Sequence, residues 1–305
     1  FLFPLLAAQF FTLGFGEIGL RLMEVLFSTG FIFVSYLLIG KMFDKKLALY
    51  TSIALTFSWI ILFFTGRIMT DVPAAFFILL SFLFFWKGYI SKEGNKFIYI
   101  SAAVFALSVL TRMQSLMMVP AFMFPVFLKE KFKMCLTKKL WRGSLIFILV
   151  VAPQIYLYSQ HYGNPNSDLG RHYLGIGENV TEGNERTINS EIFKYLKDVP
   201  NIINPWLLIL FVPGLFLFFL DLIFGFDKIF HSEKLQNKFV VLFWVLCIFL
   251  VIGYINLPDP ENYVDQRYVS AALPFLFLIC ASTLIKMEDI LGKNSENKRT
   301  AKFLV

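Results

Sequence analysis

Charged residues are scarce in this sequence. Asp, Glu, Lys and Arg make up only 16% of the 305 residues, whereas 57% are hydrophobic and 38 are phenylalanine. Soluble domains carry about 25% charged residues, because their surfaces face water. A water-soluble fold of this length could not bury so much apolar surface. The composition therefore indicates an integral membrane protein.

Cysteine and clustered basic charge are also scarce. The three cysteines, Cys135, Cys247 and Cys280, allow neither a disulfide framework nor a CxxC metal site. The net charge is +7, but the basic residues lie in short loops between apolar runs, so nucleic acid is not an expected partner. The first residue is Phe1 rather than Met, within an apolar stretch of 13 residues, and we expect the sequence to lack its N-terminus.

Nine stretches come close enough to the 20 or so apolar residues that a bilayer-spanning helix needs. They lie near residues 18–40, 47–66, 72–90, 97–111, 113–128, 143–160, 206–226, 239–257 and 268–285. Backbone groups in lipid must be hydrogen-bonded within their own segment, so an open chain crosses as helices. The sequence predicts one all-α, polytopic membrane domain over residues 1–305, with a long loop at 161–205 and a tail at 286–305.

Lysine and arginine gather on one side of these spans. The connections 41–46, 87–96, 129–142 and 227–238, together with the tail, hold 20 of the 28 Lys and Arg residues. Cytoplasmic loops retain positive charge, so this side is predicted to be cytoplasmic. The loop 161–205 then lies outside, and residues 1–13 form an external surface-lying or re-entrant segment. We expect a multi-pass protein of the cell membrane with an extracytoplasmic active face.

An acid and a cation share the outer connection between the second and third spans, Arg67-Ile68-Met69-Thr70-Asp71-Val72-Pro73. Proline is tolerated in the first turn of a helix, where its missing N–H would be unpaired anyway. Asp71 is therefore expected at a helix N-terminus, where the helix dipole favours its ionised form. It is either a capping carboxylate beside an interfacial arginine or part of a site.

Two further arginines are predicted at the outer boundary. Arg112 stands between two apolar runs with almost no loop to hydrate it. A charge at membrane depth costs roughly 2.5–3.5 kcal/mol, so such a residue pairs, binds an anion or snorkels to the interface. Arg267 precedes Tyr268 and the last span, and it could pair with the nearby Asp265.

After the sixth span the chain reads His161-Tyr162-Gly163-Asn164-Pro165, which is turn chemistry. His161, Asp168 and His172 follow no established metal-ligand spacing, and no metal site is assigned.

Several short motifs follow one another along the chain, namely Phe3-Pro4-Leu5, Gly16, Arg21-Leu22, Arg67, Thr70-Asp71-Val72-Pro73, Leu110-Thr111-Arg112, Tyr162-Gly163-Asn164-Pro165, Arg267-Tyr268 and Leu273-Pro274. In their order and sidedness these motifs resemble the GT-C membrane glycosyltransferases that use polyprenyl-phosphate sugars, of the protein O-mannosyltransferase and aminoarabinose lipid A transferase type. The similarity runs from Phe1 to about Ile285. It implies a GT-C-like helical bundle.

The resemblance also implies an activity, namely transfer of a sugar from a polyprenyl-phosphate donor to a protein, lipid or glycan acceptor, with inversion at the sugar. No cofactor is firmly implied, and a divalent metal is undecided. The family's first-loop carboxylate is expected upstream of Phe1. Leu2-Phe3-Pro4-Leu5 stands where aminoarabinose transferases have Lys-Pro-Pro-Leu. This difference argues against aminoarabinose as the transferred sugar.

The same resemblance implies roles for particular residues. Arg112 and Arg267 are assigned to the donor phosphate, and Asp71 to supporting acid chemistry or acceptor orientation. Further substrate-binding residues are expected at Arg67, His161, Tyr162, Asn164 and Tyr268.

Two other kinds of protein fit the same pattern of apolar helices with few outward charges. One is a secondary transporter or lipid flippase, although transporters place polar sites near the midplane, often in repeated halves, and no internal repeat is visible here. The other is a noncatalytic membrane assembly subunit.

Overall fold

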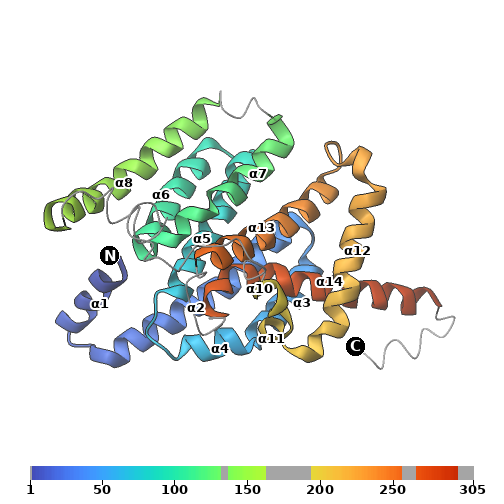
Figure 1. The fold of residues 1–305 in the computed structure, drawn as a ribbon, viewed down its shortest axis with the longest axis horizontal. Helices are drawn as coiled ribbons and strands as arrows, with labels where there is room; N and C mark the ends of the chain where they lie inside the picture. The colour runs from blue at the N-terminus through green and yellow to red at the C-terminus, as the bar shows by residue number, and fades with distance from the viewer. Residues whose placement is uncertain (1, 132–136, 163–193, 256–265, 295–305) are drawn as a thin grey trace, which may run out of the picture.

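The structure is a computed structural model that describes residues 2–131, 137–162, 194–255 and 266–294. Within these ranges every regular element is a helix, which confirms the all-α prediction (Figure 1). The elements are α1 (Leu2–Thr12), α2 (Gly16–Met42), α3 (Lys45–Thr56), α4 (Trp59–Thr65), α5 (Asp71–Phe85), η1 (Trp86–Ile90), α6 (Asn95–Thr111), η2 (Met113–Met118), α7 (Val119–Glu130), α8 (Lys138–Tyr162), α10 (Lys194–Lys197), α11 (Val199–Ile203), η6 (Pro205–Leu207), α12 (Leu208–Phe224), η7 (Phe226–Lys228), α13 (Glu233–Ile255), η8 (Gln266–Ala272) and α14 (Leu273–Asn294).

Five helical segments in the described ranges are long and apolar enough to cross a bilayer. They are Gly16–Met42, Asp71–Ile90, Lys138–Leu157, Pro205–Phe224 and Val269–Leu291. The predicted span 47–66 coincides with α3 and α4, which meet at an angle of 56° and together form either a broken span or a re-entrant segment. The other predicted spans fall on α6, on η2 followed by α7, and on α13, and their crossing remains a prediction.

Aromatic side chains fill the centre of the bundle, where α5 packs against α2, α6 and η8. Phe82 of α5 lies with its ring centroid 4.4 Å from that of Trp244 on α13 and 5.1 Å from that of Phe122 on α7. Aromatic contacts at these separations add to the gain from close packing. Ser81 and Ser101 link α5 to α6, each hydroxyl donating to the other residue's carbonyl at 2.8 and 2.9 Å. Such bonds satisfy polar groups that no water reaches.

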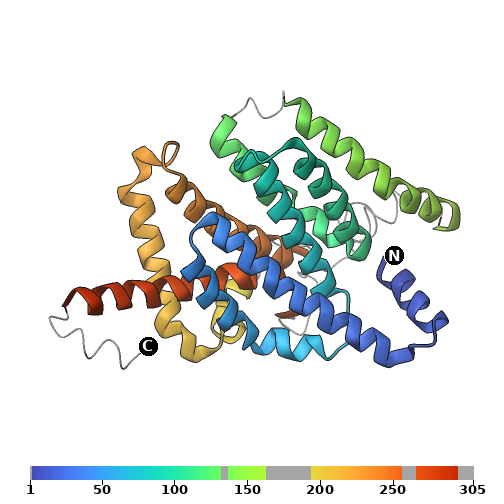
Figure 2. The same cartoon turned by 180° about the vertical axis from the view of Figure 1, so that it is seen from behind.

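The spans differ in how much protein surrounds them. In the α14 span, 78% of the residues of an 18-residue apolar window are buried within the protein, whereas in the α8 span only 11% are. Both views place α8 at one side of the molecule and α12 at the other (Figure 2). The apolar outer face of α8, with Leu145, Ile148 and Leu149, lies on the surface of the protein and is exposed.

The N-terminal segment folds back on the start of α2. Phe3 of α1 forms a small cluster with Leu20 and Met23 of α2, apart from the main core. An 11-residue helix is about 16 Å long, too short to cross a bilayer. The structure thus agrees with a non-spanning segment, while its surface-lying or re-entrant position stays a prediction.

Helices α12 and α14 approach unusually closely at Gly214. A Cβ atom at this position would stand 2.2 Å from the carbonyl oxygen of Ile279 and 2.6 Å from Oγ1 of Thr283. Thr283 also donates to the carbonyl of Leu210 at 2.7 Å, across the same interface. Small residues at helix interfaces in membranes permit this approach.

We therefore expect Gly214→Ala to force α12 and α14 apart and to lower the midpoint of thermal unfolding in detergent by several degrees. Overpacking of this kind costs about 1–3 kcal/mol. Gly40→Ala is the matched control, because the nearest atom to its Cβ, that of Ala48, would be 3.7 Å away. Equal midpoints for the two variants would contradict the close packing of α12 on α14.

Candidate functional site

Asp71 begins α5, as Pro73 led us to predict, and its side chain is buried. The cap position belongs to Thr70, which makes no side-chain cap hydrogen bond. The carboxylate of Asp71 forms an ion pair with the guanidinium of Arg112. Burial of a carboxylate is costly unless a charge and hydrogen bonds compensate it. Pairing with Arg112, rather than a capping role alone, therefore accounts for Asp71.

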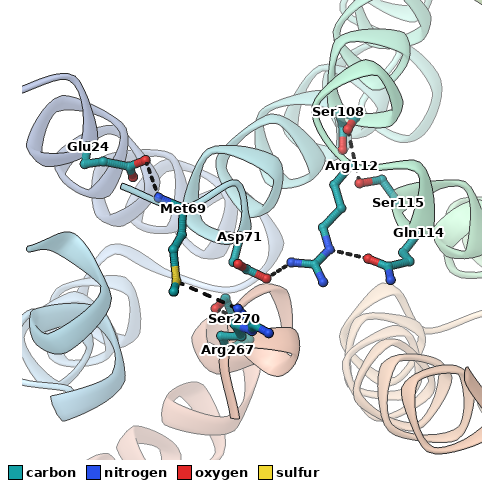
Figure 3. Close-up of polar contacts among 9 residues, drawn as sticks. All are labelled: Glu24, Met69, Asp71, Ser108, Arg112, Gln114, Ser115, Arg267 and Ser270. Carbon is teal, nitrogen blue, oxygen red and sulfur yellow. Dashed lines mark hydrogen bonds and ion pairs between the residues drawn. The ribbon is translucent and has the colours of Figure 1, made fainter. Parts of the chain in front are cut away.

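Arg112 occupies a break between two helices. Its backbone is extended, with φ −151° and ψ 116°, where α6 ends and the 3-10 helix η2 begins. The backbone is fixed on both sides, because the Arg112 N–H donates to the carbonyl of Ser108 at 2.8 Å and its carbonyl accepts from the N–H of Ser115 at 3.0 Å. Its Nε also donates to Oε1 of Gln114 (Figure 3). The guanidinium is thus held by neighbours at both its Nε and its Nη1.

Arg267 reaches the same place from the other end of the sequence. It lies in the 3-10 helix η8, where its carbonyl accepts from the hydroxyl of Ser270 at 2.5 Å. Its Nη1 lies 4.0 Å from Sδ of Met69, two residues before Asp71. In Figure 3 the side chains of Asp71, Arg112 and Arg267 converge on the start of α5. Two cations and one carboxylate therefore gather from three separate segments.

The remaining predicted residues are placed less centrally or not described. Arg67 is exposed, and its guanidinium lies 4.0 Å from the centroid of the Phe63 ring, a cation–π contact. His161 and Tyr162 end α8 and Tyr268 lies in η8, but their side chains fall outside the described residues, as do Asn164 and Asp265 entirely. Substrate-binding roles for this group remain predictions.

The structure adds Glu24, which our sequence analysis missed. This residue lies within the long apolar helix α2, is 0% exposed, and accepts a hydrogen bond from the backbone N–H of Met69 at 3.2 Å (Figure 3). The sequence held a signal for it, because an ionisable residue inside an apolar span is a candidate functional residue by default. Gln114 was missed as well, and no pattern distinguishes it from other polar residues.

Metal-ligating side chains do not gather in the part of the chain that the structure describes. No group of three or more His, Cys, Asp or Glu residues there could hold a metal ion. The chemistry within reach of the described site is that of one carboxylate and two guanidinium groups. Such an arrangement can bind an anion, and arginine does so with forked, charge-assisted hydrogen bonds.

The chain is similar in sequence or in fold to several known proteins. An uncharacterized protein of Aquifex aeolicus (strain VF5) is 24% identical over 279 residues, which is 91% of this chain and 52% of that protein. ArnT from Cupriavidus metallidurans shares the fold, both in its apo state (TM-score 0.61, 17% identity) and bound to undecaprenyl phosphate (TM-score 0.63, 16% identity). Each match covers 93% of this chain and 49% of ArnT. The chain thus spans about half the length of these proteins.

These structures confirm the predicted GT-C-like helical architecture. Residues 1–157 match the family described as dolichyl-phosphate-mannose-protein mannosyltransferase. That range includes Arg67, Asp71 and Arg112 and extends over more than half of the sequence. The chain therefore belongs to the dolichyl-phosphate-mannose-protein mannosyltransferase family.

Proposed function

We propose that the protein is a membrane glycosyltransferase that moves a sugar from a polyprenyl-phosphate donor to a protein, lipid or glycan acceptor. The observation that carries this proposal is the ion pair of Arg112 with the buried carboxylate of Asp71, together with the contact of Arg267 with Met69, two residues before Asp71. Membership of the family supports the sugar transfer. The fold shared with ArnT bound to undecaprenyl phosphate supports a polyprenyl-phosphate lipid as the donor carrier.

The two arginines would hold the donor phosphate. A guanidinium carries five N–H donors in a planar fork, so one arginine can bind a carboxylate and a phosphate oxygen together. With Asp71 ionised, the three side chains have a net charge of +1, which favours an anionic ligand. As the bond from sugar to phosphate breaks, negative charge grows on the departing lipid phosphate. Donors that are already oriented stabilise this charge without further rearrangement.

Asp71 would orient the acceptor or assist its deprotonation. In the transfer, the acceptor oxygen forms a bond to the anomeric carbon while the bond to the phosphate oxygen breaks, and the acceptor proton passes to a base. A carboxylate near the reacting atoms can take part in that proton transfer. A single displacement of this kind inverts the configuration at the anomeric carbon.

We also propose that transfer takes place on the extracytoplasmic face. Asp71 begins the 20-residue helical segment α5–η1, which is about 30 Å long, and the lysine-rich connection 87–96 starts within η1 at the other end. The excess of positive charge on cytoplasmic loops supports this orientation.

The direct test of the function is a transfer assay with purified protein, expressed from its complete gene, in liposomes that contain a labelled polyprenyl-phosphate sugar. A glycosyltransferase passes the label covalently to an acceptor. A flippase moves intact labelled lipid between leaflets, and an assembly subunit does neither. Either of these last two outcomes would refute the proposal.

Arg267→Ala should reduce transfer, because the developing phosphate charge loses one of its donors. Loss of such a donor costs about 3–4 kcal/mol, or roughly 100- to 1000-fold in kcat/KM for the donor lipid. Lys238→Ala is a control, because Lys238 is a largely buried cation that pairs with Asp221, and this pair links α12 to α13 at the lysine-rich connection 227–238. Normal donor affinity and turnover for Arg267→Ala would rule out its phosphate role.

Asp71→Asn tests whether Asp71 acts on the acceptor or serves only to hold Arg112. The substitution removes one negative charge beside the phosphate, so the KM for the donor should not rise. The kcat should fall about tenfold or more, as expected for loss of a proton-accepting or acceptor-orienting group. Steady-state kinetics with donor and acceptor varied in turn would measure both constants. A raised donor KM with unchanged kcat would mean that Asp71 serves only to hold Arg112.

Sidedness can be measured with single cysteines placed in a variant without native cysteines. Ile68→Cys, on the connection before Asp71, should react with a membrane-impermeant maleimide added to intact cells. Glu93→Cys, on the lysine-rich connection, should react only after the membrane is permeabilised. The reverse pattern would place the site on the cytoplasmic face.

A further inference from the structure

One face of α2 is polar along the part that meets the α4–α5 connection. Arg21, Glu24 and Ser28 are spaced three and four residues apart and so lie on the same side of the helix. Arg21 donates to the carbonyl of Gly66 at 3.4 Å, and Ser28 accepts from the hydroxyl of Thr65 at 2.7 Å. Glu24, between them, accepts from the backbone N–H of Met69 at 3.2 Å. Each of the three side chains thus binds a different point of residues 65–69.

Burial of the Glu24 side chain is energetically unfavourable for a residue that makes a single hydrogen bond. Its side chain is fully buried, and its second carboxylate oxygen, Oε2, finds no hydrogen-bond partner among the residues that the structure describes. Burying a carboxylate with incomplete pairing costs more free energy than a single hydrogen bond returns. An apolar residue of similar size would remove this cost, which offsets the loss of the acceptor for the Met69 N–H, so the fold should be about as stable. Stability alone therefore does not explain a glutamate at this position.

The residue that Glu24 binds is central to the candidate site. Met69 contacts Arg267 through its sulfur, and Asp71, two residues further on, pairs with Arg112. Residues 67–69 are not helical, so their backbone is not fixed by a helical hydrogen-bond ladder. The carboxylate of Glu24 supplies a fixed acceptor for this segment from the long helix α2.

We propose that Glu24 is a positioning residue, whose hydrogen bond to the Met69 backbone fixes the α4–α5 connection so that Asp71 and Arg267 face the same ligand. This inference rests on the proposed function for the ligand and the reaction. The position of the connection can be measured without either.

The activity arm compares Glu24→Leu with Glu24→Gln. Leucine removes the acceptor, and transfer should fall tenfold or more in kcat while the midpoint of thermal unfolding stays equal or rises. Glutamine keeps an oxygen that accepts from Met69 and should retain activity within about threefold of the wild type. Ser35→Ala is the matched control, because Ser35 is also buried on α2, and its hydroxyl donates to the carbonyl of Phe31 within the same helix. Its kcat should be unchanged.

The second arm measures hydrogen exchange of the peptide that contains Met69, without any substrate. Loss of one hydrogen bond to a protected amide should speed its exchange about fivefold in Glu24→Leu, and not in Glu24→Gln or Ser35→Ala. If wild-type protein transfers no sugar, the proposed function fails, and this arm still tests the positioning role. Unchanged exchange in Glu24→Leu, or an inactive Glu24→Gln, would overturn the inference.

Discussion

The cost of placing charge among apolar helices governs this structure. Asp71 and Arg112 are both largely buried, and each is tolerable there because the other is present. Their pairing ties the start of α5 to the end of α6, two helices that pack along their length and share the Ser81–Ser101 contact. Because Asp71 is already paired with Arg112, the nearby Arg267 gives these three side chains a net charge of +1. The electrostatics of the candidate site therefore follow from one interaction between neighbouring helices.

Residues of the site lie where regular α-helix stops. Asp71 is the first residue of α5, Arg112 separates α6 from η2, and Arg267 belongs to a 3-10 helix. In lipid, broken backbone is tolerated only where protein or a cavity satisfies it. The bonds of Arg112 to Ser108 and Ser115, and of Met69 to Glu24, meet this requirement. Irregular backbone and functional side chains thus occur together for the same physical reason.

Sequence reasoning recovered the helical class, the boundary at Arg112 and the helix start at Asp71, because these follow from apolar length and local chemistry. Contacts between side chains of different helices could not be predicted from the sequence. Which carboxylate meets Arg112, or that Arg67 stacks on Phe63, depends on side-chain directions that no spacing fixes. The bend between α3 and α4 also went unpredicted, since Phe57 and Ser58 offer no proline or glycine signal. Glu24 was overlooked although its charge within an apolar run marked it.

Because α14 is more deeply buried in the protein than α8, the two helices should tolerate different amino-acid substitutions during evolution. Residues 273–281 of α14 are enclosed by other helices, so their side chains must conserve volume and shape, and replacements such as Leu for Ala are excluded by neighbours. Few residues of the α8 span are covered by the rest of the protein, and in a bilayer its exposed face would meet acyl chains, which adapt to any apolar outline. Homologous chains should therefore keep residue identity along residues 273–281 while exchanging Leu, Ile, Val and Phe freely along the outer face of α8.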